Sequence, residues 1–480
     1  MQNNSRMNVN QIMQQASQAF EAYKRIKPVQ RAAFLETIAT EIAARKEILV
    51  QIAGEETNLP AARLNGEVGR TTHQLSLFAQ LIKEGSWVEA VIDTKPNIRR
   101  MLMPVGPVVV FGASNFPFAF STAGGDTASA LAAGATVVIK GHPAHPRTSM
   151  LVFEAIQAAI AQTGMPPFTV QHVTGDYQIG QELVMHPCTT SVGFTGSFQG
   201  GKALVAYAAQ RETPIPVFAE MGSVNPVVFL PEALQTRATE LAATFATSIT
   251  LGAGQFCTNP GLLIGLQSEA FTQFQELLGA ALEQTSPQRM LHPGIHQSFL
   301  KGRSAMLAQE EVTLLEHPAM IADEALVGPS LANTTGAAFL ANPALKEEVF
   351  GPYALLVACK DKAELLQVLK SVKGQLTTSI MATPADLASW QEVVELQISL
   401  AGRIILNNPP TGVEVCAAMI HGGPYPATTD ARYTSVGTGA IRRWVRPVCF
   451  QNFDDTLLPD ELKQDNPCGI WRLVDNTFSR

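Results

Sequence analysis

The stretch Val108-Val-Val-Phe-Gly-Ala-Ser-Asn-Phe-Pro117 decides the fold class of this chain of 480 residues. It begins with an apolar, uncharged run, which is typical of a short buried strand, and the glycine and polar residues that follow indicate a turn. A helix of small residues is expected from Thr122 to Ala133, and a second apolar strand, Thr136-Val-Val-Ile139, ends at Lys140. This order of strand, helix and strand predicts a doubly wound α/β fold, with a parallel sheet covered by helices on both faces.

Polar features follow the predicted strands of this sheet. Further strands are expected near 169–173, 191–194 and 216–222, and the loop Gly193-Phe-Thr-Gly-Ser-Phe-Gln-Gly-Gly201 follows the second of them. Because ligands bind such sheets beyond the carboxyl ends of the strands, Asn115 and Lys140 are candidate site residues. The loop lacks the GxGxxG spacing. A glycine-rich turn that opens a helix can bind phosphate through backbone N–H groups, but many such turns are only tight turns, so both interpretations stay open.

Two further parts of the chain flank this sheet. Residues from Val9 to Lys83 carry apolar side chains at helical spacing and predict helices. Beyond Asn225 a second region alternates between strands and helices and predicts a second α/β domain, interrupted by a less regular excursion from Ser286 to Gly336. Its strands are expected at 226–229, 262–265, 355–358, 379–382 and 403–406, with a helix over 384–396.

Composition excludes several classes of function. The formal charge is −7, which gives no attraction to nucleic acid or to an anionic membrane, and no uninterrupted apolar span is long enough to cross a bilayer. The six cysteines lie far apart without a CxxC pair, which argues against a zinc site and a disulfide framework. The N-terminal MQNNSRMNVNQ lacks the apolar core of a signal peptide. We therefore expect a cytoplasmic protein without a metal, a nucleic-acid partner or a membrane anchor.

Two residue types with catalytic potential stand beside glycines. Cys257 lies in Leu251-Gly-Ala-Gly-Gln-Phe-Cys-Thr-Asn-Pro260, after an apolar helical run, where it is displayed as a nucleophile would be. A single cysteine is more often a small buried hydrophobe. Glu220 ends an apolar strand before Gly222, where shielding should raise the pKa of its carboxyl, as a general base requires. An exposed strand-end glutamate is the ordinary alternative.

Taken together, five ordered motifs resemble those of the aldehyde dehydrogenases. They are GASNFP around Asn115, FTGS at 194–197, AEMGS around Glu220, GQFC ending at Cys257 and EEVFGP at 347–352. Their order and separations fit the family from about residue 100 to 425. Within the family, KGHPAHP at 140–146, GQFCTNPG and HGGPYPAT are similar to the 2-oxoglutarate semialdehyde dehydrogenase group, and a related bacterial NADP-dependent fatty aldehyde dehydrogenase shares many of these residues.

The resemblance implies a division of roles around one aldehyde substrate. Cys257 would attack the aldehyde carbon, and the oxyanion would be held by the Asn115 amide and the Cys257 backbone N–H. Glu220 would then activate water to hydrolyse the thioester left by hydride transfer to NAD or NADP. The implied cofactor-binding residues are Lys140, Pro143, Gly196, Ser197, Gly201, Glu348 and Phe350.

Some residues depart from the common family pattern. Ser114 stands where a tryptophan precedes the catalytic asparagine, and Gly124 stands where a lysine is usual, which puts a proton relay through that lysine in doubt. In place of that lysine, His421 either lines the active site or is an ordinary loop histidine, and both interpretations stay open. Arg70 and Gln74, on a helix resembling the one that lines the family's aldehyde tunnel, are the candidate substrate-binding residues, with Arg70 holding a carboxylate.

The expected activity is NAD(P)-dependent oxidation of 2-oxoglutarate semialdehyde to 2-oxoglutarate. A medium- or long-chain aldehyde is the alternative substrate, and a catalytically silent binding relative is the alternative of another class. The resemblance also implies a homodimer or homotetramer. The expected division of the chain is a cofactor domain (1–84 and 101–222), a catalytic domain (223–424), an oligomerisation element (85–100 and 453–480) and a return segment on the cofactor domain (425–452).

Overall fold

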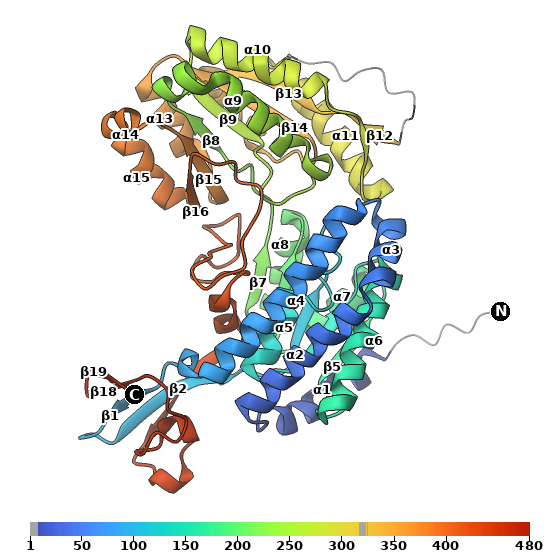
Figure 1. Ribbon diagram of the computed structural model, residues 1–480, viewed down its shortest axis with the longest axis vertical. Helices are drawn as coiled ribbons and strands as arrows, with labels where there is room; N and C mark the ends of the chain where they lie inside the picture. The colour runs from blue at the N-terminus through green and yellow to red at the C-terminus, as the bar shows by residue number, and fades with distance from the viewer. Residues whose placement is uncertain (1–7, 316–322, 324) are drawn as a thin grey trace, which may run out of the picture.

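The computed structural model describes residues 8–315, 323 and 325–480 (Figure 1). Two expectations fall partly outside these residues. The absence of a signal peptide rests partly on residues 1–7, and the predicted irregular excursion includes residues 316–322 and 324. Within the described residues no helix is both long enough and apolar enough to cross a membrane.

Five parallel strands form the first sheet, in the order β5-β4-β3-β6-β7. The first strand in sequence, β3, lies in the middle of the sheet; β4 and β5 follow on one side of it, and β6 and β7 follow on the other. The order therefore reverses between β3 and β6, and a crevice opens at that point. The predicted strands are confirmed within a few residues: β3 (Val108–Phe111), β4 (Val137–Lys140), β5 (Val170–Val173), β6 (Ser191–Thr195) and β7 (Val217–Glu220).

Helices cover both faces of this sheet, as the sequence predicts. Val108 and Val110 of β3 pack into one core with α2, α4, α5 and α6, whereas Val109 packs on the other face with α1, α7 and α8. Alternate residues of one strand thus serve two cores. The helices are α1 (Val9–Tyr23), α2 (Pro28–Ala44), α3 (Lys46–Thr57), α4 (Ala61–Glu84), α5 (Gly125–Ala133), α6 (Pro146–Thr163), α7 (Tyr177–Met185) and α8 (Phe198–Ala209).

A seven-stranded sheet lies above the first in Figure 1, in the order β11-β13-β14-β9-β8-β15-β16. All its pairs are parallel except β11 with β13, and β16 is an edge strand. Its strands are β8 (Val227–Phe229), β9 (Leu262–Leu266), β11 (Thr313–Leu314), β13 (Ser330–Thr335), β14 (Tyr353–Cys359), β15 (Gln375–Met381) and β16 (Ala401–Leu406).

The excursion expected to be irregular carries more order than predicted. It contains the 15-residue helix α11 (Pro293–Leu307) and strand β13 of the large sheet. The helix expected over 384–396 is broken at Trp390 into α14 (Pro384–Ser389) and α15 (Gln391–Leu400). The remaining helices of this part are α9 (Pro231–Thr250), α10 (Glu269–Glu283), α12 (Gly336–Ala341) and α13 (Lys362–Ser371).

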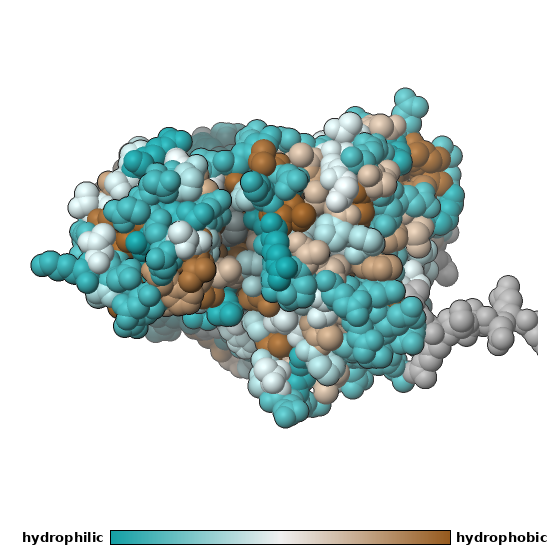
Figure 2. Space-filling model, turned by 90° about the horizontal axis from the view of Figure 1, so that it is seen from below, coloured by the Kyte–Doolittle hydropathy of each residue, from teal (hydrophilic) through white to brown (hydrophobic). Residues whose placement is uncertain are grey.

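A small sheet projects from the lower left of Figure 1, in the order β17-β2-β1-β18-β19. It joins β1 (Val91–Asp93) and β2 (Ile98–Pro104) to β17 (Val445–Gln451), β18 (Arg472–Val474) and β19 (Thr477–Ser479). Strand β17 comes from the segment assigned above to the return across the cofactor domain, so this sheet takes in more of the chain than the predicted oligomerisation element. Seen from below, the molecule shows apolar patches among mainly hydrophilic side chains (Figure 2).

Candidate active site

The turn before Cys257 is built from residues with positive φ. Helix α9 ends at Thr250, and Gly252, Ala253 and Gly254 follow with φ of 55°, 54° and 64°. Gly254 must be a glycine because a Cβ there would overlap the backbone of Gly351. The sharp turn brings Cys257, half-buried, to the space between the two large sheets.

Asn225 holds the backbone of the loop that carries Cys257, a role that we did not predict from the sequence. Its buried amide Nδ2 donates to the carbonyl oxygens of Cys257 and Asn259, both at 2.9 Å. Ser223 in turn donates to Asn225 Oδ1 at 2.8 Å. Asn225 has a φ of 47°, a conformation that asparagine tolerates better than most residues. An asparagine two residues after the Ala-Glu-Met-Gly-Ser motif was the available signal.

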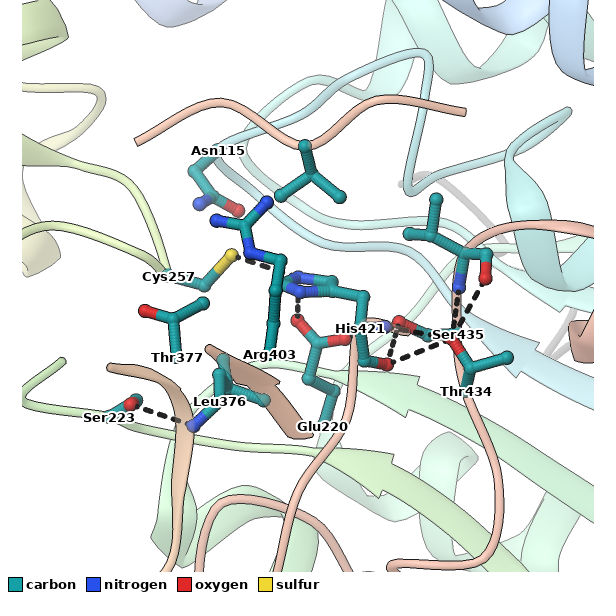
Figure 3. A network of polar contacts seen from close by, with 12 residues as sticks. Asn115, Glu220, Ser223, Cys257, Leu376, Thr377, Arg403, His421, Thr434 and Ser435 are labelled. Atoms are coloured by element: carbon teal, nitrogen blue, oxygen red, sulfur yellow. Dashed lines mark hydrogen bonds and ion pairs between the residues drawn. The ribbon is translucent and has the colours of Figure 1, made fainter. Parts of the chain in front are cut away.

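His421 is brought between the thiol and the carboxylate. Its Nε2 lies 3.4 Å from Cys257 Sγ and 2.9 Å from Glu220 Oε1, and the imidazole is buried (Figure 3). The Ser435 hydroxyl donates to Glu220 Oε2, and its backbone N–H donates to the His421 carbonyl at 2.8 Å. The Thr434 hydroxyl accepts from the His421 N–H at 2.8 Å. The structure therefore places His421 within the site, in agreement with the first of the two interpretations left open by the sequence, and not with an ordinary loop histidine.

The pKa of Glu220 corrects one sequence-based expectation. Burial of the carboxyl would raise its pKa, but the charge and hydrogen bond of His421 and the hydrogen bond of Ser435 outweigh burial, and the pKa is lowered. The expectation of a raised pKa was wrong because both partners lie more than 200 residues away in sequence. Glu220 is thus an ionised carboxylate at neutral pH.

The Cys257 thiol has the opposite shift. Burial raises its pKa well above the ordinary value, the nearby Glu220 carboxylate raises it further, and the Arg70 guanidinium opposes both. A thiol in this state needs a proton acceptor before it can attack a carbonyl carbon. His421 Nε2, at 3.4 Å, is placed to be that acceptor when the imidazole is neutral and carries its proton on Nδ1.

Asn115 stands on the opposite wall from Glu220. It is 9% exposed, and its Nδ2 donates to the Gln255 carbonyl at 3.2 Å, which ties it to the nucleophile turn. Arg63 of α4 donates to the Asn115 carbonyl at 2.6 Å and stacks at 4.5 Å over the ring of Phe256. Arg63 therefore links the asparagine to the turn that carries Cys257, a second role without a signal in the sequence.

The two candidate substrate residues on α4 have different surroundings. The Arg70 guanidinium lies 5.5 Å from the Phe120 ring centre, donates to the Val413 carbonyl, and leaves its buried Nε and Nη2 without a hydrogen-bond partner. Gln74 is buried against Gly125, near the Ser435 carbonyl, and its Nε2 has no partner. Arg70 thus adjoins the thiol, and Gln74 lies towards the segment that binds Glu220.

The expected cofactor residues lie around the crevice of the first sheet. Lys140 ends β4; burial lowers its pKa, and the Asp176 carboxylate opposes that shift. Ser197 caps α8 by accepting from the Gly200 N–H at 3.2 Å. This 12-residue helix points its N-terminus at the crevice, which fits a pyrophosphate group. Pro143 is exposed in the turn after Lys140.

Glycines make room for the same crevice. A Cβ on Gly196 would lie 2.6 Å from the Phe194 ring, and one on Gly201 would lie 2.6 Å from Met221 Sδ. A larger residue at either position would therefore have to displace the Phe194 ring or the Met221 side chain. On the other side, Glu348 and Phe350 line a cavity together with Ser223 and Asn259. The surrounding protein raises the pKa of the Glu348 carboxyl, although the residue is exposed to solvent.

The departure at Gly124 has a steric cause. A Cβ at this position would lie 2.5 Å from the Ala119 carbonyl oxygen, so no lysine fits there without moving the backbone. The proton path of this chain must use other groups. Among the described residues, Glu220, Cys257 and His421 form the one group of ligand-type side chains close enough to hold a metal ion, with their atoms within 4.8 Å of one another.

Comparisons with known proteins agree with this geometry. The family model described as "Aldehyde dehydrogenase family" matches residues 1–424. Alpha-ketoglutaric semialdehyde dehydrogenase of Acinetobacter baylyi is 46% identical over 98% of this chain and 91% of its own length. Alpha-ketoglutaric semialdehyde dehydrogenase 2 of Azospirillum brasilense is 46% identical over 96% of this chain and 90% of its own.

Solved structures show the same fold at low identity. Gamma-glutamyl-gamma-aminobutyraldehyde dehydrogenase of Burkholderia cenocepacia superposes with a TM-score of 0.79 at 22% identity, over 93% of this chain and 88% of its own. The NAD-bound 1-pyrroline-5-carboxylate dehydrogenase of Thermus gives a TM-score of 0.79 at 20% identity, over 92% and 85%. With the family model and the full-length relatives, these findings show that the chain belongs to the aldehyde dehydrogenase family, whose members oxidise aldehydes with a nicotinamide cofactor.

Proposed function

We propose that the chain oxidises 2-oxoglutarate semialdehyde to 2-oxoglutarate. The relatives at 46% identity carry that substrate in their names. The observation that carries the proposal is Arg70, whose partly unpaired guanidinium is buried beside Cys257. A buried guanidinium with free donors is suited to a carboxylate, which it can hold through two parallel hydrogen bonds. The carboxylate of an acidic semialdehyde can accept hydrogen bonds from the unpaired Arg70 donors, and a neutral aldehyde has no such group.

The first step we propose uses four residues of the site. In the tautomer with its proton on Nδ1, His421 accepts the proton of the Cys257 thiol on Nε2, and the Glu220 carboxylate stabilises the imidazolium formed. The thiolate attacks the aldehyde carbon, giving a thiohemiacetal oxyanion. The Asn115 amide, on the wall opposite Glu220, and the Cys257 backbone N–H hold this oxyanion, and such a donor is typically worth about 3 kcal/mol.

The second step releases the acid. When bound, the nicotinamide cofactor supplies the hydride acceptor, and a thioester then remains on Cys257. Glu220 removes a proton from the water that attacks this thioester, a role for which its ionised state suits it. Ser435, which donates to Glu220 Oε2, keeps the carboxylate oriented during the exchange.

We also propose that both NAD and NADP are accepted. Many relatives specific for NAD have a glutamate three residues after the lysine, where it repels a 2′-phosphate, and Pro143 occupies this position here. The proposed cofactor residues are Lys140 for the adenosine ribose, Gly196, Ser197 and Gly201 around the pyrophosphate, and Glu348 and Phe350 for the nicotinamide riboside.

One observation favours a second candidate substrate class. The rings of Phe116, Phe120 and Phe256 pack near Asn115 and Cys257, with centre distances of 5.2 and 5.6 Å from Phe116 to the other two. An aromatic wall of this kind also suits a medium- or long-chain aldehyde. A silent binding relative is disfavoured, because it would not need Cys257 and Glu220 around one histidine.

We propose that the protein is a cytoplasmic homodimer or homotetramer, and two features of its surface support the association. The outer edge of β16 is unpaired among the described residues, and Ile404 and Leu406 on it are exposed. Leu457, Trp471 and Phe478 near the small sheet are exposed as well. Unpaired edges and apolar patches are usually covered by a partner. We keep the domain division given by the sequence as part of this proposal, except that strand β17 of the return segment joins the small sheet of the oligomerisation element.

The test is a panel of four aldehydes assayed with both cofactors. The panel contains 2-oxoglutarate semialdehyde, glutarate semialdehyde, pentanal and dodecanal, and kcat/KM is determined for each from the absorbance of the reduced nicotinamide. We expect kcat/KM for the 2-oxo acid to exceed that for pentanal by about tenfold or more, as one well-made buried charge contact allows. Equal values for pentanal and the 2-oxo acid would contradict the proposal, and a maximum at dodecanal would favour the second class.

A further inference from the structure

A second arginine reaches the substrate space from the opposite part of the molecule. Arg403 lies on the edge strand β16, and its side chain extends towards Asn115 and Cys257 (Figure 3). Charge interactions link Arg403 to Cys257 and to Arg70 of α4. Two guanidiniums, one from each side of the cleft, therefore act on the same thiol.

Neither guanidinium has partners for all its donors. Arg403 donates from Nη1 to the Gly412 carbonyl at 2.8 Å and from Nη2 to the Pro410 carbonyl, but its buried Nε has no partner. Arg70 donates from Nη1 to the Val413 carbonyl, but its buried Nε and Nη2 have none. A buried donor without an acceptor costs free energy, so the unpaired nitrogens around one thiol indicate a ligand rich in acceptor oxygens.

The charges lead to the same conclusion. Arg70 and Arg403 repel each other, and among the described residues no ion pair joins Arg403 to a carboxylate. Two like charges held partly out of water raise the free energy of the empty site. An anionic ligand lowers it by screening the repulsion and by pairing with both groups.

We propose that Arg70 and Arg403 form a two-arginine clamp for the 2-oxo acid head of the substrate, and that Arg403 determines specificity for the 2-oxo group. This inference rests on the proposed function and deepens it. A 2-oxo acid presents a carboxylate and an adjacent carbonyl, and thus one acceptor oxygen more than a simple acid. Two planar donor forks on opposite walls match that head better than one fork does.

A purely structural role makes a different prediction. The same side chains hold the segment 410–413 through its carbonyl groups. If that is the whole function of Arg403, its loss should disturb the site for every aldehyde. Substrates that differ only in the head therefore separate the two roles.

The experiment compares Arg403→Met, Arg403→Lys and the wild-type holoenzyme on three aldehydes. These are 2-oxoglutarate semialdehyde, glutarate semialdehyde, which lacks the 2-oxo group, and pentanal, which lacks the acid. For Arg403→Met we expect kcat/KM to fall about thirtyfold on the first, about fivefold on the second and less than twofold on the third, since each buried charge-assisted contact is worth a factor of roughly ten. Arg403→Lys, which keeps the charge without the fork, should lie between wild type and Met on the 2-oxo acid.

A binding measurement and a control accompany the kinetics. The affinity for the product 2-oxoglutarate, measured by calorimetry, should weaken about tenfold or more in Arg403→Met. Arg211→Met is the matched control, because Arg211 also donates to two backbone carbonyls, those of Val184 and Pro187, outside the substrate space. It should leave all three aldehydes and the product affinity unchanged.

The outcomes distinguish this inference from the proposed function. Equal losses on all three aldehydes, or an unchanged affinity for 2-oxoglutarate, would overturn the clamp. If Arg403→Met does not fold, Arg403→Lys decides: a loss confined to the 2-oxo acid supports the clamp, and a loss shared by pentanal overturns it. A wild-type enzyme that does not prefer the 2-oxo acid to pentanal overturns the proposed function itself.

Discussion

The catalytic centre and the arginine region of the same cleft differ in how fully their polar groups are paired. Around Cys257 the important groups are tied to the protein: Asn225 holds the Cys257 carbonyl, and His421 and Ser435 hold Glu220. Elsewhere in the cleft, Arg70 and Arg403 keep buried nitrogens without acceptors. At the catalytic centre the buried atoms without a hydrogen-bond partner are His421 Nδ1 and Glu220 Oε1, which faces His421 Nε2, whereas in the arginine region they are cationic donors.

This difference assigns chemistry to one region and recognition to the other. Buried groups that the protein itself holds in place need little reorganisation when charge develops on the substrate, so the catalytic centre can serve any aldehyde. Unpaired guanidiniums gain partners only when an anion arrives, so they contribute to binding of acids alone. Substitutions in the first region should therefore affect all substrates alike, and those in the second should affect acids selectively.

The largest effect is expected at Cys257. Cys257→Ala removes the thiol of the site, so no thiohemiacetal can form and the first turnover is lost with every aldehyde. The rate should fall by at least about ten-thousandfold, as for other nucleophile deletions. The measurement is single-turnover formation of reduced nicotinamide. Cys449→Ala, at an exposed cysteine, is the control and should behave as wild type.

Glu220→Gln should separate acylation from hydrolysis. The amide keeps the shape but cannot accept a proton, so the thioester should form and persist, and steady-state turnover should fall by about a hundredfold to ten-thousandfold. Rapid mixing should show a burst of reduced nicotinamide approaching one per site, and mass spectrometry should find the acyl group on Cys257.

Two other outcomes at Glu220 are informative. A slowed burst would show that the carboxylate also promotes removal of the thiol proton, through His421 Nε2 at 2.9 Å from it. Unchanged steady-state turnover would contradict the assignment of Glu220 as the base for hydrolysis.

His421→Gln should shift the pH dependence. In the wild type the interactions with His421 and Ser435 together outweigh burial and keep the pKa of Glu220 low, so the carboxylate is ionised at neutral pH. Without the imidazole, burial dominates and the pKa rises, so the acid limb of the kcat profile should move to higher pH. We also expect about a tenfold loss at neutral pH, because the thiol loses its proton acceptor. An acid limb at the wild-type position would contradict the coupling.

These residues also show what the sequence could and could not predict. The first sheet was predictable because runs such as Val108–Phe111 and Val137–Ile139 are apolar on both faces, as buried parallel strands require. The helix expected from Thr122 begins only at Gly125, where the chain has turned: the Gly124 N–H bonds the Ser121 carbonyl. Local patterns therefore gave the elements, and their ends depended on contacts that patterns do not encode.

Within the site, motif residues were predictable and their partners were not. Asn115 and Cys257 stand in recognisable motifs, and the structure brings them to one cleft. The pKa of Glu220 depends on His421 and Ser435, which reach it through a segment that pairs at Thr428. Such pairings join distant parts of the chain, and only the folded structure shows them.

In the arginine region, Arg70→Met should weaken recognition of the acid. The KM for the proposed substrate, the 2-oxo acid semialdehyde, should rise by about tenfold, which corresponds to about 1.4 kcal/mol. Pentanal should be spared, because a neutral aldehyde has no carboxylate for the guanidinium to hold. Arg25→Met, at an exposed arginine outside the cleft, should change neither value and serves as the control. Equal effects on the acid and on pentanal would refute the assignment and would place Arg70 with the paired, structural groups.

The smallest effect is expected at the cofactor edge, with Pro143→Glu. Pro143 is exposed beside Lys140, so a new carboxylate there would repel a 2′-phosphate through water rather than through protein. At about 4 Å this repulsion is worth roughly 1 kcal/mol, or about a fivefold rise in KM for NADP. NAD, which has no phosphate, should be unaffected or bound slightly better through its ribose hydroxyls. Pro143→Gln, of similar size without charge, is the control. A wild-type enzyme that does not turn over NADP at all would remove the basis of this prediction, and equal changes for both cofactors would show that the turn, and not the charge, had been disturbed.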